Sequence, residues 1–162
     1  MTDFEVTAEP GVPQVQTART FDAPLDLVYR AFTEPDLLVQ WLGPHGYTMT
    51  IDRYDVHDGG TYRYTHTDDK GNAWAFHGVF HGDPSTDGMV QTFEFEGAPG
   101  HVSMDTVTFE EREGRTTVHT NSVFQSVEDR DAMVTSGMET GMREGYERLE
   151  ELLVRELKAR HD

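Results

Sequence analysis

Between residues 47 and 124 the sequence contains a series of short strand-like segments with no helical pattern between them. Turn signals such as Gly59-Gly60 and Glu113-Gly114 separate the segments. Consecutive strands joined by short turns pair antiparallel, because a parallel connection needs a crossover of roughly a dozen residues or more. The pattern therefore predicts an antiparallel meander, with strands over residues 47–57, 61–67, 73–81, 89–96, 102–111 and 116–124.

A long amphipathic helix is predicted to follow the strands. Ser126 and Asp129 are spaced as in a capping box, which marks a helix start, and the helical pattern continues to about Lys158. Charged residues occupy one face of this helix. The other face carries an apolar stripe, which predicts packing against the sheet: Val134, Met138, Met142, Tyr146, Leu149, Leu153 and Leu157.

Three glycines, Gly137, Gly141 and Gly145, lie beside this stripe at a spacing of four. Each glycine inside a helix costs about 1 kcal/mol relative to alanine, so the three together cost roughly 3 kcal/mol. Two explanations would offset this: the helix backbone lies very close to the sheet, or the missing side chains leave space for a ligand. A helix break near Gly137 is a third. Met138 and Met142 slightly favour a ligand, because methionine adapts to varied shapes.

The N-terminal part is predicted to contain one strand and two short helices. Residues 1–13, with two prolines and no periodicity, are predicted to form a flexible arm. A strand is expected over residues 14–21, and a helix after Asp22 and Pro24. A second helix over residues 36–41 ends before a Gly-Pro pair. The length of 162 residues suits one domain, which we expect to span residues 14–162.

The composition excludes several kinds of site and partner. The chain has no cysteine, which rules out disulfides, thiolate metal sites and a cysteine nucleophile. The net charge of −17 repels phosphate groups, so neither nucleic acid nor an anionic membrane is expected as a partner. No apolar run approaches the roughly 20 residues that span a bilayer. With no signal-peptide pattern at the N-terminus, a cytoplasmic location is expected.

Alternation along the strands places aromatic side chains on one face of the predicted sheet. The loop 68–72 sets a register in which Tyr64 opposes Phe76. Tyr62 then opposes Gly78, whose backbone the ring covers. These patterns suit an ordinary core, and they also suit a pocket between sheet and helix. The predicted ligand-binding residues are Trp41, Tyr62, Tyr64, His66, Trp74, Phe76, Phe93, Phe95, Met138, Met142 and Tyr146.

No catalytic or metal-binding constellation is predicted. Eight histidines are present, but none has HExxH spacing. His77 and His81 are four apart on a strand, which separates them by about 13 Å, too far for one metal ion. His66 is a candidate acid or base at the mouth of the pocket, although a strand histidine without a role is the simpler interpretation. Catalysis is left open, a non-catalytic role is favoured, and no cofactor is expected.

Four motifs, in this order, resemble a known family. They are Arg19-Thr20-Phe21-Asp22-Ala23-Pro24 with Val28, Ala31, Phe32, Thr33 and Pro35; Trp41 with Gly43-Pro44; Asp58-Gly59-Gly60-Thr61-Tyr62-Arg63; and Gly137-Met138-Glu139 with Gly141, Gly145 and Leu149. On these motifs the chain resembles, over about residues 14–157, the domain homologous to activator of heat-shock-protein-90 ATPase. That family lies in the START-like superfamily (SRPBCC). The resemblance implies an α+β helix-grip fold, in which a curved antiparallel sheet of about seven strands, two short helices and a long C-terminal helix enclose a cavity.

The resemblance implies a cavity for hydrophobic molecules such as lipids or polyketides, but no common activity. Leu42 and Met142 stand where relatives often carry aromatic residues, which alters the shape of the cavity. Three hypotheses follow, in order of preference. The first is non-catalytic binding of a hydrophobic or aromatic small molecule, and the second a cyclase- or hydrolase-type cavity enzyme. The third is a chaperone-linked protein-binding module. A homodimer is left open.

Overall fold

A computed structural model of the chain describes residues 4–161 and shows an α+β architecture. The strands are β1 (Phe4–Thr7), β2 (Gln14–Phe21), β3 (Thr48–Tyr54), β4 (Thr61–Thr67), β5 (Ala73–Ser85), β6 (Gly88–Phe95), β7 (Val102–Arg112) and β8 (Arg115–Val123). The helices are α1 (Leu25–Thr33), α2 (Pro35–Leu38), α3 (Val127–Thr135) and α4 (Met138–His161). All strands belong to one antiparallel sheet in the order β1-β2-β8-β7-β6-β5-β4-β3.

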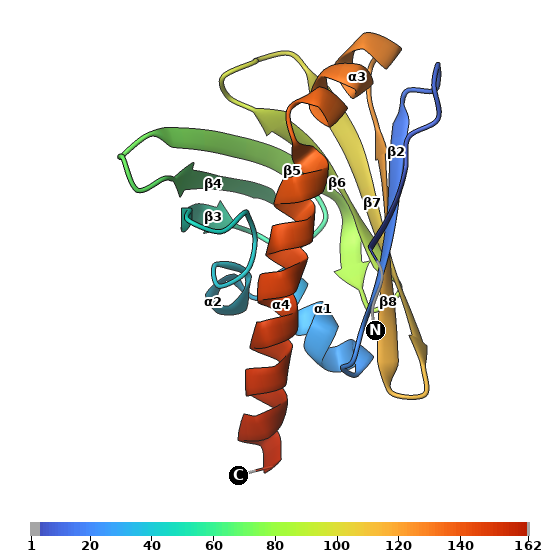
Figure 1. Ribbon diagram of the computed structural model, residues 1–162, viewed down its shortest axis with the longest axis vertical. Coiled ribbons are helices and arrows are strands. Elements are labelled where there is room, and N and C mark those ends of the chain that lie inside the picture. The colour runs from blue at the N-terminus through green and yellow to red at the C-terminus, as the bar shows by residue number, and fades with distance from the viewer. Residues whose placement is uncertain (1–3, 162) are drawn as a thin grey trace.

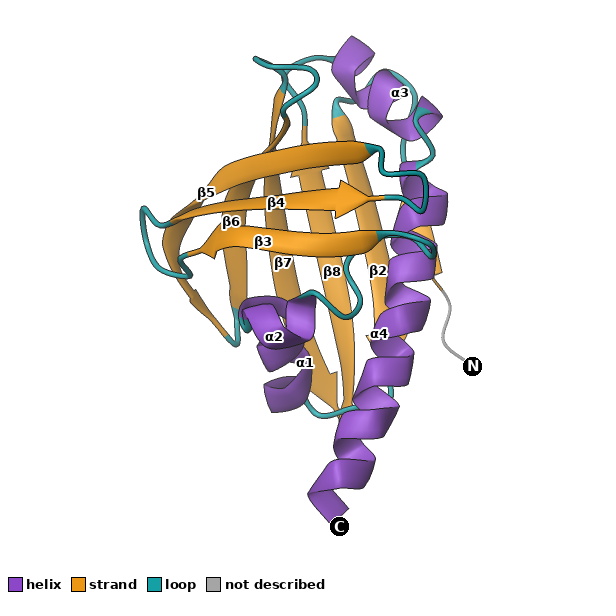
Figure 2. Cartoon of the chain, turned by 90° about the vertical axis from the view of Figure 1, so that its left-hand side faces the viewer, coloured by secondary structure: helices purple, strands orange, loops and turns teal. Residues whose placement is uncertain are grey.

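The sheet curves around α4, which lies along its concave side (Figure 1). Figure 2 shows that β3, β4 and β5 run across the direction of β2, β7 and β8, so the sheet bends strongly through β6. Helices α1 and α2 connect β2 to β3 and lie on the same concave side, near the C-terminal half of α4 (Figure 2). This is the predicted helix-grip arrangement. Among the described residues, no helix is long and apolar enough to cross a membrane.

The predicted register between β4 and β5 is confirmed. Tyr64 pairs with Phe76, and Tyr62 pairs with Gly78. A side chain at Gly78 would overlap both the Tyr62 ring and the backbone oxygen of Thr92. The Tyr62 hydroxyl uses this space to donate a hydrogen bond to that oxygen. The glycine therefore allows the Tyr62 side chain to reach across β5 to β6.

The N-terminal segment differs from the expectation of a flexible arm over residues 1–13. Phe4–Thr7 form strand β1, which pairs with β2 and raises the strand count from the expected seven to eight. The Phe4 ring lies edge-on to Tyr146, with 5.6 Å between ring centroids. This contact explains why a short edge strand is held: its inward side chain covers part of α4. Residues 1–3 of the predicted arm lie outside the described residues.

The long C-terminal helix is divided into α3 and α4. Ser126 caps α3, since its side chain accepts a hydrogen bond from the backbone nitrogen of Asp129 at 3.0 Å. At Gly137 the φ angle is +93°, a left-handed conformation that glycine adopts without strain. The helix therefore breaks there, as one of the three interpretations of the glycines anticipated. Only α4 lies in the grip of the sheet.

The solid part of the interior lies around the C-terminal half of α4. Leu149, Leu152 and Leu153 are fully buried in a cluster with α1, α2 and the neighbouring strands. Burial of side chains of this size is the main source of folding free energy, at roughly 1.5–3 kcal/mol each. This cluster joins α4 to the sheet, and its side chains fill the concave face next to α1 and α2.

Candidate functional site

Alternate residues of β4, β5 and β6 bring the predicted aromatic side chains together on the concave face. Phe76 lies at the centre of the cluster. Its ring centroid is 5.3 Å from each of those of Tyr64, Phe93 and Phe95. The cluster consists of Tyr62, Tyr64 and His66 on β4, Trp74 and Phe76 on β5, and Phe93 and Phe95 on β6. All seven predicted sheet residues are thus on one surface.

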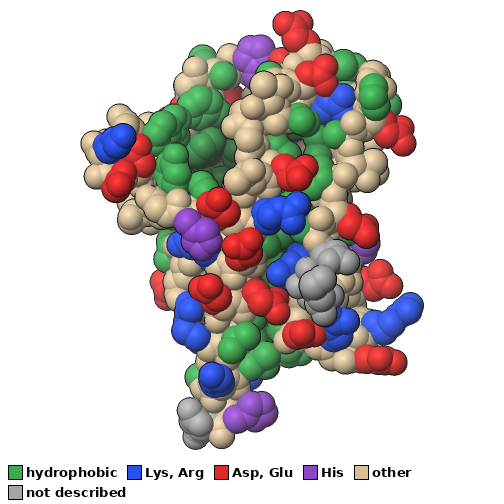
Figure 3. All heavy atoms as spheres, viewed as in Figure 1, with side chains coloured by type: hydrophobic (Ala, Val, Ile, Leu, Met, Phe, Trp, Pro, Cys, Tyr) green, Lys and Arg blue, Asp and Glu red, His purple; other side chains and the backbone are tan. Residues whose placement is uncertain are grey.

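Part of this surface is accessible, although it faces the inside of the curve. Tyr62 is 1% exposed, whereas Trp74, Phe76, Phe93 and Phe95 are only half-buried. Figure 3 shows hydrophobic side chains gathered in a hollow beside the upper part of α4, over β5 and β6. We call the accessible concave surface formed by Trp74, Phe76, Phe93 and Phe95 the groove.

The helix side of the groove is sparse. Met138 and Met142, in the first turns of α4, are half-buried, and a side chain added at Gly141 would have no heavy atom within 4 Å. The other two predicted residues lie elsewhere. Tyr146 packs in the core, 5.3 Å from Phe21, and Trp41 donates a hydrogen bond from its indole nitrogen to the backbone oxygen of Ala31. The contacts of Tyr146 and Trp41 are therefore those of core residues, and ligand contact at the others stays a prediction.

The glycines of α4 differ in their surroundings. At Gly145 an added Cβ would lie 3.3 Å from the backbone oxygen of Trp41 and 3.4 Å from Gly43. The expected close approach therefore occurs, but toward the turn after α2 and not toward the sheet. Arg148 fastens the same turn by donating hydrogen bonds to the backbone oxygens of Gln40, Gly43 and Pro44. Close packing explains Gly145, and open space surrounds Gly141.

His66 ends the row of aromatic rings. Its ring centroid is 5.1 Å from that of Tyr64 and 5.6 Å from that of Phe76, and the residue is 8% exposed. The imidazole lies where a side chain at Gly43 would be, which requires glycine in this Trp-x-Gly-Pro turn. Within residues 4–161 its buried Nε2 atom has no hydrogen-bond partner. Burial, together with the positive charge of Arg148, lowers the pKa of His66 to about 4, so the ring is neutral at neutral pH.

A half-buried carboxylate on the same inward face was not predicted from the sequence. Asp105 of β7 accepts a hydrogen bond from the Ser103 hydroxyl at 3.0 Å. Burial raises the pKa of Asp105 to about 6, although hydrogen bonds from Ser122 and Ser103 act in the opposite direction. One signal was available: Asp105 has the same parity on its strand as Val107 and Phe109, which face the core.

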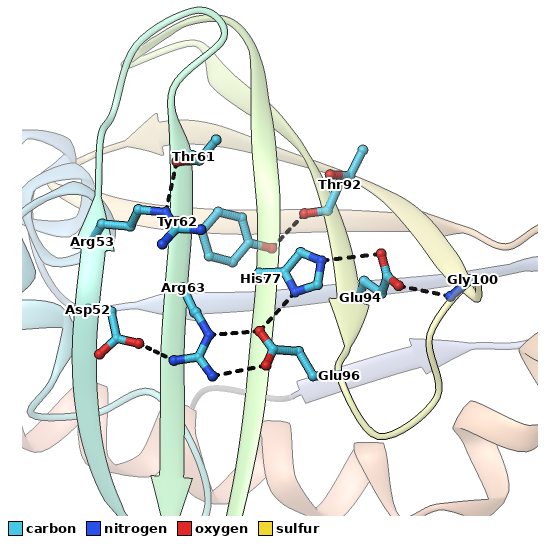
Figure 4. Close-up of polar contacts among 10 residues, drawn as sticks. All are labelled: Asp52, Arg53, Thr61, Tyr62, Arg63, His77, Thr92, Glu94, Glu96 and Gly100. Atoms are coloured by element: carbon cyan, nitrogen blue, oxygen red, sulfur yellow. Dashed lines mark hydrogen bonds and ion pairs between the residues drawn. The ribbon is translucent and has the colours of Figure 1, made fainter.

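The outer face of the sheet carries a network of acids, a histidine and an arginine. Figure 4 shows Arg63 between Asp52 and Glu96, and His77 hydrogen-bonded to Glu96. Hydrogen bonds from Arg63 and His77 lower the pKa of Glu96 to about 2. Among the described residues no three acids or histidines are arranged to hold a metal ion. This network ties neighbouring strands together on the convex surface, away from the groove.

Comparison with known proteins supports the fold and the family. The family model described as "Activator of Hsp90 ATPase homolog 1-like protein" matches residues 22–154. A protein of known structure from Rhodobacter sphaeroides is 26% identical, with a TM-score of 0.84, over 93% of this chain and 99% of that one. One from Arthrobacter aurescens is 27% identical, with a TM-score of 0.86, over 93% of this chain and 91% of that one. No curated protein matches the chain.

A further solved structure shows the same fold in a different setting. DynU16, a protein from the dynemicin biosynthetic locus, is 19% identical with a TM-score of 0.65, over 87% of this chain and 47% of that one. At this identity the likeness concerns the fold alone. The family model, by contrast, spans most of the sequence. The chain therefore belongs to the Activator of Hsp90 ATPase homolog 1-like protein family, within the START-like superfamily.

Proposed function

We propose that this protein binds a hydrophobic or aromatic small molecule in the groove, without chemical change to the ligand. The observation that carries the proposal is the accessibility of Trp74, Phe76, Phe93 and Phe95 on a concave face. Half-buried aromatic side chains on the inside of a curved sheet gain further favourable burial when another molecule covers them. A concave, largely apolar surface with a few polar groups is typical of small-molecule sites.

Binding is favoured over catalysis by the state of the polar groups at the groove. A histidine that acts as a base is usually oriented by a hydrogen bond from its second nitrogen. In the described part of the chain, no hydrogen bond to a carboxylate orients the His66 ring, and its Nε2 atom has no partner. Burial also raises the pKa of Tyr64 far above its usual range, so its hydroxyl stays neutral. These groups are suited to orient a ligand.

Fluorescence titration with the neutral probe N-phenyl-1-naphthylamine tests the proposal. Saturable binding to the wild-type protein is expected, with the dissociation constant raised about tenfold or more in Phe76→Ala, because the central ring of the aromatic cluster is lost. Val79→Ala is the matched control, since Val79 lies on the convex side of the same strand. Equal affinity of the wild type and Phe76→Ala, with both proteins folded by circular dichroism, would overturn the proposal.

A further inference from the structure

A row of paired residues crosses the concave face beneath the groove. Gln91 of β6 pairs with Asp105 of β7, and Asp105 pairs with Ser122 of β8. The row ends at two apolar residues, Phe80 on one side and Val15 on the other, both essentially fully buried. Opposed residues in a sheet share a face, so the three polar side chains point inward with them. Gln91, Asp105 and Ser122 are nevertheless half-buried, so the inner face is not completely filled here.

Arg19 and Asp105, two charged residues on the inward face of the sheet, have different partners. Arg19 of β2 has an acidic partner, Glu150 of α4 at 3.2 Å, and its guanidinium lies 4.3 Å from the centre of the Phe21 ring. In the described chain, Asp105 accepts hydrogen bonds only from hydroxyl groups, those of Ser103 and Ser122. Among residues 4–161, no Lys, Arg or His forms an ion pair with Asp105, whereas Arg19 does have an acidic partner. An ionised carboxylate in such a place lacks the counter-charge that buried charges normally have.

Two tyrosine rings lie on the same inward face, and the hydroxyl of Tyr62 donates a hydrogen bond to the backbone oxygen of Thr92, the neighbour of Gln91. Tyr62 and Tyr64, which stack on each other at 6.0 Å, are close enough to the carboxylate for its charge to act on their hydroxyl groups. Ring faces attract cations, and a carboxylate beside them adds a charge-assisted hydrogen bond. Two hydroxyl groups already donate to Asp105, so the property that the site lacks is positive charge. The net charge of −17 attracts cations to the molecule as a whole.

We propose that Asp105 anchors the protonated amine of a ligand whose apolar part lies against the aromatic residues of the groove. The ligand class is therefore an apolar amine, with its ammonium group between Asp105 and the tyrosine rings. This inference rests on the proposed function, because it names the chemistry of the molecule that the groove binds. The ammonium group of the ligand supplies the positive charge that the described part of the chain does not place beside the Asp105 carboxylate.

A matched pair of probes tests the assignment: 2-(2-naphthyl)ethylamine, which is charged at pH 8, and 2-(2-naphthyl)ethanol, which is neutral. Isothermal titration calorimetry of the wild type should show the amine binding about tenfold more tightly than the alcohol. Asp105→Asn keeps the shape and the acceptor oxygen but removes the charge, and it should abolish that preference while leaving alcohol binding intact. Asp69→Asn, in the exposed loop after β4, is the control for the change in net charge.

The outcomes separate the two proposals. Equal affinity of the wild type for both probes, or an unchanged preference in Asp105→Asn, would overturn the amine assignment while the binding function stands. Failure of both probes to bind would overturn the binding function itself. The comparison of the two probes in the wild type needs no variant, so it decides the question even if Asp105→Asn fails to fold.

Discussion

The two halves of α4 pack in different ways. From Tyr146 onward, its inward side chains are buried against α1, the turn after α2 and the sheet. Before Gly145, Met138 and Met142 are half-buried and Gly141 has open space beside it, opposite aromatic residues that are themselves accessible. The sheet and α1 therefore hold α4 firmly from Tyr146 to Leu153 and loosely at its N-terminal end. Stability is concentrated in the closed half, which leaves the open half available for a ligand.

The largest expected effect tests that division directly. Leu149→Ala removes a fully buried side chain from the closed half and should lower the free energy of unfolding by about 4 kcal/mol. Met142→Ala removes a half-buried side chain from the open half and should lower it by about 1 kcal/mol. Urea denaturation at pH 8 measures both. Similar losses for the two variants would contradict the contrast between the halves.

Asp105 should make stability fall as the pH rises. Its pKa is about 6 in the folded protein and 3.8 in a model peptide, so between these values the folded state binds the extra proton. The protonated Asp105 therefore contributes about 3 kcal/mol to the free energy of unfolding below pH 3.8. This contribution is lost as the pH rises through 6. Tyr62 and Tyr64, the titratable groups that face it, stay neutral. Asp105→Asn should therefore gain stability relative to the wild type from pH 4 to pH 8 in urea titrations; a constant difference would refute this.

His66 should produce the opposite pH dependence. Its pKa is about 4 in the folded protein and 6.5 in a model peptide, so acid favours the unfolded state, which takes up the proton first. Stability is present above pH 6.5 and falls by about 3 kcal/mol as the pH drops toward 4. Arg148 of α4 is the charged group that faces it. His66→Gln should remove this loss in denaturation experiments at pH 7.5 and 4.5. Identical profiles for the variant and the wild type would show that the imidazole is already solvated.

The smallest effect comes from two glycines one helical turn apart. Gly141→Ala should raise the free energy of unfolding by about 1 kcal/mol, because alanine favours the helix and nothing obstructs its methyl group. Gly145→Ala gains the same propensity but places the methyl group against the backbone of Trp41 and Gly43. We therefore expect a lower thermal midpoint for Gly145→Ala than for Gly141→Ala. The reverse order would mean that the close contact at Gly145 is readily relieved.

Local patterns predicted the parts of this fold that depend on local chemistry. The register of β4 and β5 follows from a short loop and from alternation, both of which are visible in the sequence. The cap at Ser126 follows from its spacing to Asp129. Strand β1 could not be predicted in this way, because a four-residue segment shortly before two prolines has too few residues to show a pattern. Its order comes from pairing with β2 and from the contact between Phe4 and Tyr146.

The candidate site was predictable only in part, because its two sides depend on different information. The aromatic side follows from strand parity, which the sequence contains. The surroundings of Gly141 and Gly145 depend on where the turn after α2 crosses α4, and spacing alone does not specify this. Asp105 was missed because an acid in a strand normally faces water. Its parity with Val107 and Phe109 indicated the inward face, and its pairing with Gln91 and Ser122 shows it directly.

The contacts of Gly145 and Arg148 fix α4 near its middle, so the helix can tilt about this point as a rigid body. The close contact with Trp41 and the three hydrogen bonds to the turn act as a fulcrum near its middle. Met138 lies seven residues from Gly145, about 10 Å along the axis. A tilt of about 10° at this point would move that end by about 2 Å, and it would move Leu153, eight residues to the other side of Gly145, by a similar distance in the opposite direction. The width of the groove is thus set by the tilt angle of α4 relative to the sheet.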